Sequence, residues 1–433
     1  MRIAIVGTGI AGNAAAFALS RSSGASITVY EKNSRLGGHS ATVDVFYDGE
    51  TIPVDTGFIV YNEMNYPNLT ALFAHLGVET QASDMSFALS MHGGRFEWCG
   101  RTHDVLNGLF AQRRNFFSPA YLSMLVEVMR FNRLAREDRA SGFMEGMSLA
   151  AYLKVRGFSK RFRDGYLVPM GAAIWSMSPT AMTGFPAASF VAFFENHHLM
   201  QWNRPVWRTV KGGSRSYVEK ITAPFRDRIR TGAGVVHVER TDAGVHVTDA
   251  TGATETHDAI VFASHSDETL AMLADATPAE REILGAIRYR ANDVWLHRDP
   301  SLMPVRRRAW AAWNVIQGDD PDADVCVTYW MNALQNIDQN RPLFVTLNPP
   351  KPPREDLVFG RFDYAHPQYD EAAIAAQKRM EEIQGRRRTW FCGAWQGYGF
   401  HEDGLASGLR VAEALGGSVP WRNTGPAMAE AAE

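Results

Sequence analysis

The sequence predicts an α/β fold: a Rossmann-type dinucleotide-binding domain, discontinuous in sequence, with an inserted α+β substrate-binding domain. Three observations predict it. An apolar run near the N-terminus leads into a glycine-rich turn and a helix of small residues, the next strand ends in an acid, and another strand, glycine-rich turn and helix follow near the C-terminus. With 433 residues, the chain is long enough to form several lobes around sizeable cores.

The N-terminal motif predicts a clamp for a dinucleotide. The run Arg2–Val6 is followed by Gly7-Thr8-Gly9-Ile10-Ala11-Gly12 and by a helix over Asn13–Leu19. Gly7 allows the tight turn, Gly9 lets a pyrophosphate approach the backbone, and Gly12 lets the helix pack close to the strand. The helix N-terminus, with the N–H groups of Ile10 and Ala11, would face the anion.

The second strand, Ser26–Tyr30, ends at Glu31, about twenty residues downstream, where a carboxylate is expected to hold a ribose hydroxyl. Strand, turn, helix, strand and acid follow in order within one βαβ unit. The sequence therefore predicts nucleotide binding.

The stretch Glu31–Ser40 resembles the E-x-x-x-R-x-G-G extension of the FAD-dependent amine oxidase and phytoene desaturase superfamily. The resemblance implies FAD as the cofactor and an amine-oxidase-like fold. Adjacent glycines let the backbone crowd a cofactor, and an arginine offers a fork of donors to phosphate. The residues implied as cofactor-binding here are Lys32, Arg35, Gly37, Gly38 and His39.

Two further segments resemble the same superfamily. Near the C-terminus, a short strand over Arg388–Trp395 precedes Gln396–Gly408, which opens a helix through Leu415. The helix N-terminus would stabilise negative charge on the reduced flavin. Ala394 stands where many relatives carry an acid that contacts ribitol, so that contact is in doubt or passes to Glu402 or Asp403. The implied cofactor-binding residues of this segment are Gly393, Glu402, Asp403 and Leu405.

The third segment, Val210–Ile221, resembles a glycine pair that these oxidoreductases place before a helix, and the backbone of Val235 would then reach the adenine. We therefore expect residues 1–60, 211–261 and 390–423 to form the FAD-binding domain. Residues 61–210 and 262–389 would form the substrate-binding domain, and 424–433 a tail.

A narrower resemblance points to a lipid substrate. Asp55–Asn62, Trp207–Tyr217 and Gly399–Gly404 are similar to a bacterial group of FAD-binding proteins typically encoded beside cyclopropane-fatty-acid synthase-like methyltransferases. That group is also similar to the N-terminal domain of plant cyclopropane-fatty-acid synthases. The resemblance implies a fatty acyl substrate and a methyltransferase of this kind as a partner.

The insertions supply the substrate-binding domain. The first is expected to be helical, with amphipathic helices over Asn68–Leu76, Tyr121–Arg136 and Phe143–Val155. Strands are expected in the second, over Asp293–His297, Arg308–Val315 and Asp324–Tyr329. The apolar stretches 172–177 and 185–194 carry small residues that would leave room for an acyl chain, although plain core packing also explains them.

Candidate catalytic residues are His401, Tyr398 and Tyr61. A histidine with a near-neutral pKa could take a proton while hydride leaves the substrate. Alternatively, a histidine in a turn before a helix could do no more than cap the helix or orient neighbouring groups. His197 and His198 could lie at the mouth of the site, but no carboxylate spacing supports a metal site.

Composition limits the expected partners and the cellular location of the protein. The net charge is −3 and the basic residues are dispersed, so nucleic acid is not an expected partner. The arginine runs 306–308 and 386–388 are expected in solvated turns, or alternatively at anionic lipid headgroups. Cys99, Cys326 and Cys392 predict free, mostly buried thiols. Without a signal peptide or a long apolar span, we expect a cytoplasmic protein, at most peripheral to the inner face of the membrane.

The sequence thus predicts an FAD-dependent oxidoreductase that desaturates an apolar substrate, a methylated acyl chain of phospholipid, by hydride transfer to flavin N5. An amine or polyamine oxidase and a non-catalytic flavoprotein partner of the methyltransferase remain as alternatives.

Overall fold

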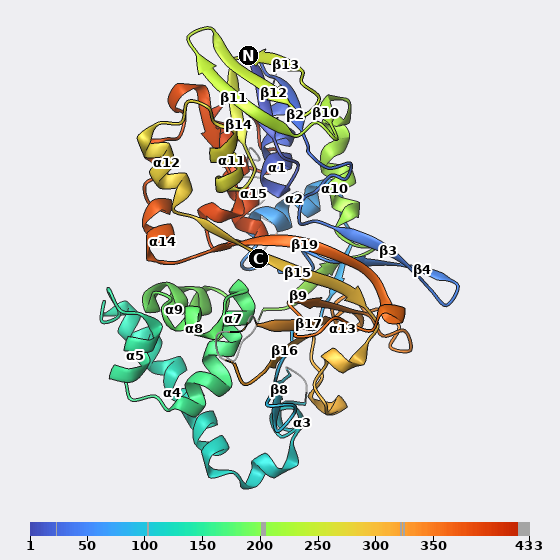
Figure 1. The fold of residues 1–433 in the computed structure, drawn as a ribbon, viewed down its shortest axis with the longest axis vertical. Helices are drawn as coiled ribbons and strands as arrows, with labels where there is room; N and C mark the ends of the chain where they lie inside the picture. The colour runs from blue at the N-terminus through green and yellow to red at the C-terminus, as the bar shows by residue number, and fades with distance from the viewer. Residues whose placement is uncertain (23, 102–103, 201–204, 321–322, 324, 423–433) are drawn as a thin grey trace, which may run out of the picture.

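The computed structural model describes residues 1–22, 24–101, 104–200, 205–320, 323 and 325–422. Figure 1 shows the dinucleotide-binding domain at the top, with the N-terminus, and the substrate-binding domain below it. The predicted α/β class is confirmed. The expected tail, 424–433, and Asp324 lie outside the described residues.

The dinucleotide-binding domain is built on a parallel sheet with the strand order β10-β2-β1-β14-β20. N-terminal, middle and C-terminal parts of the chain all supply strands. The apolar residues of β1 and β14 are buried because layers of structure cover both faces of the sheet. The strands are β1 (Arg2–Val6), β2 (Ser26–Tyr30), β10 (Ile229–Arg230), β14 (Ala259–Phe262) and β20 (Thr389–Phe391).

Helices α1 (Ile10–Ser20) and α15 (His401–Ala414) pack against each other on one face of this sheet. At their crossing a side chain on Gly408 would collide with the Ala11 carbonyl, so the close approach requires glycine. Helices α2 (Pro67–Leu76) and α10 (Arg215–Thr222) share the same apolar core.

The other face is covered by three helices and a small antiparallel sheet. The helices are α11 (Ser266–Met272), α12 (Pro278–Gly285) and α14 (Glu371–Gln377). The strands are β11 (Val235–Thr241), β12 (Gly244–Asp249) and β13 (Thr254–His257).

The substrate-binding domain contains a seven-stranded sheet in the order β19-β15-β18-β17-β16-β7-β8. Its two longest strands, β15 and β19, form a ribbon that crosses the molecule beneath the dinucleotide-binding domain (Figure 1). The strands are β7 (Phe87–Met91), β8 (Phe96–Gly100), β15 (Arg288–His297), β16 (Trp313–Gln317), β17 (Cys326–Trp330), β18 (Phe344–Leu347) and β19 (Val358–Gln368), with α13 (Met331–Leu334) after β17.

Strands β7 and β8 correct the expectation that the first insertion is helical. Gly93 and Gly94 have φ values of 63° and 83° and turn the chain into a hairpin. Strand β7 then pairs in parallel with β16 of the second insertion, so both insertions build one sheet.

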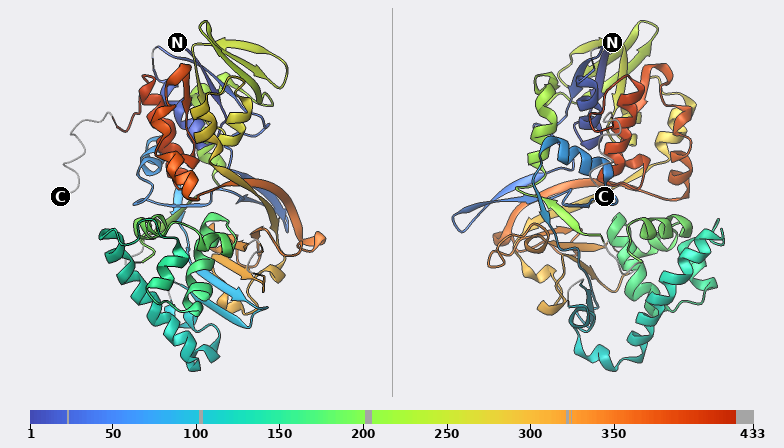
Figure 2. Two further views of the ribbon diagram at one scale, coloured as in Figure 1. Left: turned by 60° about the vertical axis from the view of Figure 1, so that its left-hand side comes forward. Right: turned by 180° about the vertical axis from the view of Figure 1, so that it is seen from behind.

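The helices of the first insertion form a lobe beside this sheet, which Figure 2 shows from two further directions. Serine hydroxyls cap α4, α5, α6 and α8. The core of the lobe is rich in phenylalanine, tyrosine and tryptophan. The helices are α4 (Pro119–Ala140), α5 (Leu149–Val155), α6 (Lys160–Phe162), α7 (Val168–Trp175), α8 (Pro179–Thr183) and α9 (Ala187–Asn196).

Short sheets connect the two domains. Strands β3 (Thr42–Tyr47) and β4 (Glu50–Asp55) form an antiparallel hairpin that projects from the molecule (Figure 1). Strand β9 (Trp207–Val210) lies between β5 (Val60–Asn62) and β6 (Thr80–Ala82).

Several expected elements shift in extent. The helices expected at Asn68 and Tyr121 correspond to α2 and α4, whereas the one expected from Phe143 begins only at Leu149, because a turn with Gly146 at φ 69° precedes it. A 3₁₀ turn occupies Arg307–Ala309, so the strand expected from Arg308 begins at Trp313. All three cysteines are free and buried, as predicted.

Candidate functional site

The glycine-rich turn between β1 and α1 contains three glycines, and only one of them has open space where a side chain would be. Gly7 has φ 99° and supports the turn, while a side chain on Gly12 would collide with the Gly7 carbonyl. Gly9, in contrast, has no atom within 4 Å of the position a Cβ would take. It precedes α1, whose first N–H groups, starting at Ile10, receive no side-chain cap. This is the geometry that a helix N-terminus offers to an anion.

Glu31 holds the turn together. Its buried carboxylate accepts hydrogen bonds from the Thr8 backbone N–H at 3.0 Å and the Thr8 hydroxyl at 2.5 Å. The backbone and side-chain N–H groups of Asn33 donate to the other carboxylate oxygen, both at 2.9 Å. The carboxylate thus fixes the turn directly, and a ribose hydroxyl would have to share or replace the Asn33 amide.

The turn after β2 lies against the glycine-rich turn. Gly38 has φ 56°, and a Cβ there would lie 3.0 Å from the Gly9 Cα, so the two backbones are in close contact. The Arg35 guanidinium donates to the carbonyl oxygens of Leu36, Gly38 and Ser40, so it braces this turn.

The residues expected to reach the adenine of the cofactor lie at the carboxyl end of β2. Lys32 forms an exposed ion pair with Glu268 at 2.6 Å. The Ala233 N–H donates to the Glu31 carbonyl, which brings Val235, the first residue of β11, to the end of β2.

The C-terminal segment ends its strand at Phe391 and reaches α15 through a glycine-rich turn. Gly393 donates its N–H to the Ser407 hydroxyl at 2.9 Å, and Leu405 is buried in the core that α1 shares. The Glu402 carboxylate accepts from the backbone N–H groups of Asn68 and Leu69, so it caps α2. Asp403 accepts from the N–H groups of Tyr398 and Phe400, and burial raises its pKa to about 6. Both acids are therefore engaged by backbone amides.

His401 lies at the start of α15 with its imidazole stacked on Phe58, the ring centroids 3.8 Å apart. Its Nε2 lies 2.6 Å from the Tyr217 hydroxyl and 3.3 Å from the Ser40 hydroxyl, and these two hydroxyls are hydrogen-bonded to each other. Burial lowers the pKa of His401 to about 3. The near-neutral pKa expected from the sequence is therefore corrected, and His401 is an uncharged hydrogen-bonding group.

More histidines gather where the domains meet. The ring of His39 lies 5.6 Å from that of His366 on β19 and 6.2 Å from that of His265, with Tyr364 at 5.1 Å. His366 Nδ1 is 3.1 Å from the Ser176 hydroxyl at the end of α7. Burial lowers the pKa of His366 to about 4 and those of His39 and His265 below their ordinary values. The cluster is uncharged at neutral pH.

An aromatic wall from the helical lobe faces the start of α15. Phe193 stacks on Phe400 at 5.0 Å and on His197 at 3.8 Å, and Trp175 lies 4.7 Å from Phe193. Tyr398 joins this wall, 5.9 Å from Phe193. As whole residues, Tyr398, Phe400 and His401 remain partly exposed.

Tyr61 is not brought to this wall. Its ring is buried in the core of the dinucleotide-binding domain, 5.2 Å from Phe73 and 6.2 Å from Tyr66. Sequence reasoning missed Tyr217, Phe58, His265 and His366. Phe58 and Tyr217 lay within segments that carried the resemblance, whereas His366 had no local signal, because only the fold brings β19 to the turn at His39.

The residues present fit a flavin dinucleotide. His39 Nε2 is buried and has no hydrogen-bond partner among the described residues, although burying an unpaired polar atom is costly. It follows directly on the glycine turn that lies against Gly9, where space beside the α1 N-terminus is open. An unsatisfied imidazole nitrogen next to an anion cradle is the arrangement expected where a polar cofactor binds.

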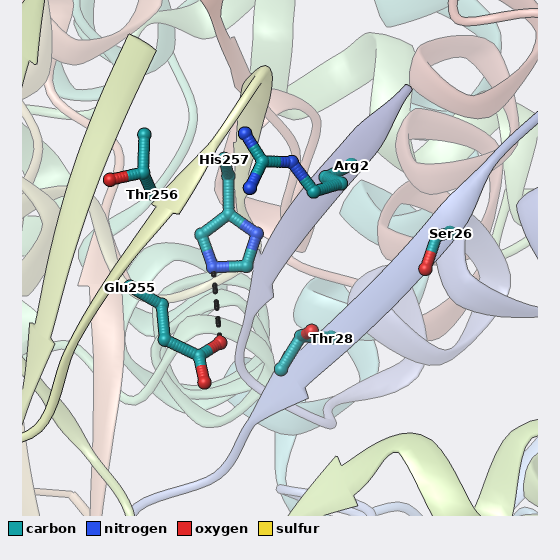
Figure 3. A pocket seen from close by; sticks show the side chains of 6 residues that line it. All are labelled: Arg2, Ser26, Thr28, Glu255, Thr256 and His257. Atoms are coloured by element: carbon teal, nitrogen blue, oxygen red, sulfur yellow. Dashed lines mark ion pairs between the residues drawn. The ribbon is translucent and has the colours of Figure 1, made fainter.

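A separate pocket of about 210 Å³ lies on the dinucleotide-binding domain, between the first residues of β1 and β2 and strand β13 (Figure 3). It is lined by Arg2, Ser26, Thr28, Glu255, Thr256 and His257, and His257 Nε2 is 3.7 Å from the Glu255 carboxylate. The glycine motif follows the opposite, carboxyl end of β1, so this pocket is distinct from the dinucleotide cradle.

Comparison with known proteins places the chain in one family. Residues 10–292 match the family described as flavin containing amine oxidoreductase. A search of curated proteins gives no match.

Solved structures share the fold across almost the whole chain. Cyclohexylamine oxidase from Brevibacterium oxydans is 17% identical with a TM-score of 0.68, covering 96% of this chain and 98% of its own. Putrescine oxidase bound to putrescine is 14% identical with a TM-score of 0.66, covering 96% and 99%. The CLA-producing fatty acid isomerase from P. acnes is 15% identical with a TM-score of 0.64, covering 95% and 98%. Within the described residues, no helix is both long enough and apolar enough to cross a membrane.

Proposed function

The chain belongs to the family of flavin-containing amine oxidoreductases and binds FAD, and from this premise we propose that it dehydrogenates an apolar substrate, a methylated fatty acyl chain of a phospholipid. The acyl chain would lose two hydrogens as a carbon–carbon double bond forms. A methylated, unsaturated chain has weakened allylic C–H bonds, which suits a flavin enzyme without a metal oxidant. Bound FAD supplies the two-electron acceptor.

The observation that carries the proposal is a group of uncharged histidines beside aromatic rings at the junction between the domains. The imidazoles of His39, His366 and His401 are all neutral at pH 7, because burial lowers each pKa. Tyr398 and Phe400, which remain partly exposed and pack against the buried Phe193, supply apolar surface next to His401. A hydrocarbon chain gains from leaving water for such a surface.

The chain's own residues would position the reactants. Gly9 and the α1 N-terminus would hold the pyrophosphate, and His39 Nε2 would hydrogen-bond to the cofactor. His401, fixed by Phe58 and Tyr217, would orient groups at the start of α15 without taking up a proton itself. The aromatic wall would exclude water from the reacting bond.

The fold relatives divide between two substrate classes. One structure of the same fold is a CLA-producing fatty acid isomerase, which supports the proposal. Cyclohexylamine oxidase and putrescine oxidase support the alternative, an amine oxidase, as does the family's description. An amine substrate would reduce the flavin and generate peroxide under oxygen. The proposed source of methylated chains is a partner methyltransferase similar to cyclopropane-fatty-acid synthases.

Product analysis tests the proposal. Holoenzyme is incubated with phospholipids that carry methylated, unsaturated acyl chains, and the lipids are analysed by mass spectrometry. We expect a species two hydrogens lighter, with the new double bond next to the methyl branch, and none with a Gly9→Val variant that lacks FAD. Unchanged lipids together with peroxide production from an amine would reject the acyl substrate.

A further inference from the structure

We propose that the end of the substrate-binding domain farthest from the FAD cradle is a docking face for anionic phospholipid membranes. This distal face consists of Leu106, Phe117 and Val305 together with Arg101, Arg307 and Arg308. Figure 1 shows α3 (Val105–Leu109) and the chain entering α4 at the bottom of the molecule, opposite the dinucleotide-binding domain. The inference rests on surface residues alone and does not depend on which substrate is oxidised.

Large apolar side chains are left in solvent here. Phe117 is 90% exposed, Val305 is 72% exposed and Leu106 is 67% exposed. Phe117 ends a 3₁₀ turn, and its neighbour Phe116 is anchored by stacking on Phe110 at 3.7 Å. Exposed aromatic and aliphatic side chains on anchored turns are suited to insertion among lipid headgroups and acyl chains.

Arginines surround a surface pocket on the same face. The pocket has a volume of about 570 Å³ and is lined by Arg101, Arg306, Arg307, Arg308 and Trp330. The Arg307 guanidinium lies 3.8 Å from the ring centre of Trp310 and 4.9 Å from that of Trp330. Those rings hold the guanidinium in place, and burial lowers its pKa.

The positive charge on this face is not neutralised within the protein. Arg306 forms a 2.7 Å ion pair with the buried Glu97. Across the described parts of the chain, Arg101, Arg307 and Arg308 have no such acidic partner. One acid, Asp104, follows three residues after Arg101 in the chain, and its carboxylate accepts a hydrogen bond from the Asn107 amide at 2.7 Å. Unpaired guanidinium groups are strong donors to phosphate oxygens.

The apolar and basic parts form one continuous surface. Arg101 donates to the carbonyl oxygens of Arg308 and Trp310 at 3.2 Å and 2.8 Å. Helix α3 packs against the turn Arg307–Ala309. Arg113, in the turn that ends at Phe117, donates to the Asn107 side chain of α3 at 2.8 Å. Apolar residues that insert and arginines that bind phosphate are thus arranged together, which favours an anionic bilayer over an uncharged one.

Vesicle binding of the intact holoenzyme tests this inference. Co-sedimentation is measured with vesicles of phosphatidylcholine alone and of phosphatidylcholine mixed with phosphatidylglycerol. We expect binding to the mixed vesicles that weakens as salt is added. An Arg307→Glu/Arg308→Glu variant should bind at least about 25-fold more weakly, since each arginine near an anionic surface contributes a factor of about five.

A matched control separates this face from overall charge. Arg226→Glu/Arg386→Glu makes the same charge change at exposed arginines, one shortly after α10 and one just before β20, and should retain wild-type binding. Likewise, Phe117→Ser should weaken binding, whereas Val236→Ser, at another exposed residue, should not. Flavin content and thermal unfolding verify that each variant is folded. Equal binding by the two double variants, or no preference of the wild type for anionic vesicles, would overturn the inference. Because no turnover is measured, this result is independent of the proposed lipid oxidation.

Discussion

Among single residues, Gly9 and Gly12 lack a side chain for different reasons. Gly12 lacks a side chain because the turn itself would collide with one, whereas the space beside Gly9 is open and its φ of −62° suits any residue. A Gly9→Val variant should therefore fold normally and lose FAD, because the valine would occupy the space of the pyrophosphate. The measurement is flavin content beside thermal unfolding of the apoprotein.

Gly318→Val is the matched control, because no atom lies near its Cβ position either and it is remote from the motif. It should retain FAD. If Gly9→Val retains a full complement of flavin, the pyrophosphate does not bind where we place it.

His401 supports a second prediction. With a pKa of about 3, it remains neutral across the working range, so the rate of flavin reduction should show no titration near pH 6.5 caused by this residue. His401→Gln, which retains hydrogen-bonding capacity, should slow the reaction by about tenfold or less through lost positioning, with the pH profile unchanged. The measurement is the rate of anaerobic flavin reduction between pH 5.5 and about 8. A titration near pH 6.5 that disappears in His401→Gln would show that His401 exchanges a proton after all.

At the scale of elements, α15 supports a neighbouring helix through Glu402. Its carboxylate accepts from the N–H groups of Asn68 and Leu69 in the first turn of α2. Glu402→Ala should lower the free energy of unfolding by about 1–2 kcal/mol, as the loss of a helix cap does, while Glu402→Gln should lose less. Urea unfolding of the holoenzyme measures this. A variant that keeps its stability and loses FAD instead would indicate that Glu402 binds the cofactor.

The elements also show what could be predicted from the sequence. The β1–α1–β2 unit is local: its glycines, apolar runs and terminal acid all lie within about thirty residues, so their order predicts their geometry. The β7–β8 hairpin was missed although its Gly93-Gly94 turn is local, whereas the pairing of β7 with β16, more than 200 residues away, has no local signal.

In the candidate site, too, residues of one recognised segment could be predicted, whereas contacts between distant segments could not. His401 and Tyr398 belong to a recognisable segment, and the structure places both beside the aromatic wall. The contact between His39 and His366 joins residues at opposite ends of the chain, and neither sequence neighbourhood indicates the other. The sequence also did not predict that backbone N–H groups donate to Glu31, Glu402 and Asp403. The spacing of a motif does not show which protein groups a carboxylate binds.

At the scale of the whole molecule, buried histidines make stability depend on pH. Burial lowers the pKa values of His197, His297 and His366 to about 4, whereas histidines in the unfolded chain titrate at about 6.5. Between these values the unfolded chain binds protons that the folded protein excludes, so stability is present above pH 6.5 and is lost as the pH falls towards 4.

Each of these histidines contributes at most about 3.5 kcal/mol, at about 1.4 kcal/mol per pKa unit. We expect a lower free energy of unfolding at pH 5 than at pH 7, measured by urea titration. In His297→Gln the difference should shrink, because that imidazole is fully buried between Thr346 and the Asp299 N–H. Equal stability at the two pH values would contradict this reading.

The whole molecule joins an FAD cradle, an uncharged aromatic and histidine-lined junction, and a basic, apolar distal face. These parts come from segments spread along the entire chain, and they support our proposal of a flavoenzyme that takes its substrate from a membrane. The proposal that the substrate is an acyl chain connects them.

That proposal is tested most directly by an anaerobic absorbance titration of the purified holoenzyme with phospholipids carrying methylated, unsaturated acyl chains. We expect the visible flavin band to bleach with these lipids and to remain with lipids that carry saturated, unbranched chains. A flavin that stays oxidised with the lipids and bleaches with an amine would contradict the substrate while leaving fold and cofactor intact. One that stays oxidised with both would instead indicate a non-catalytic flavoprotein partner.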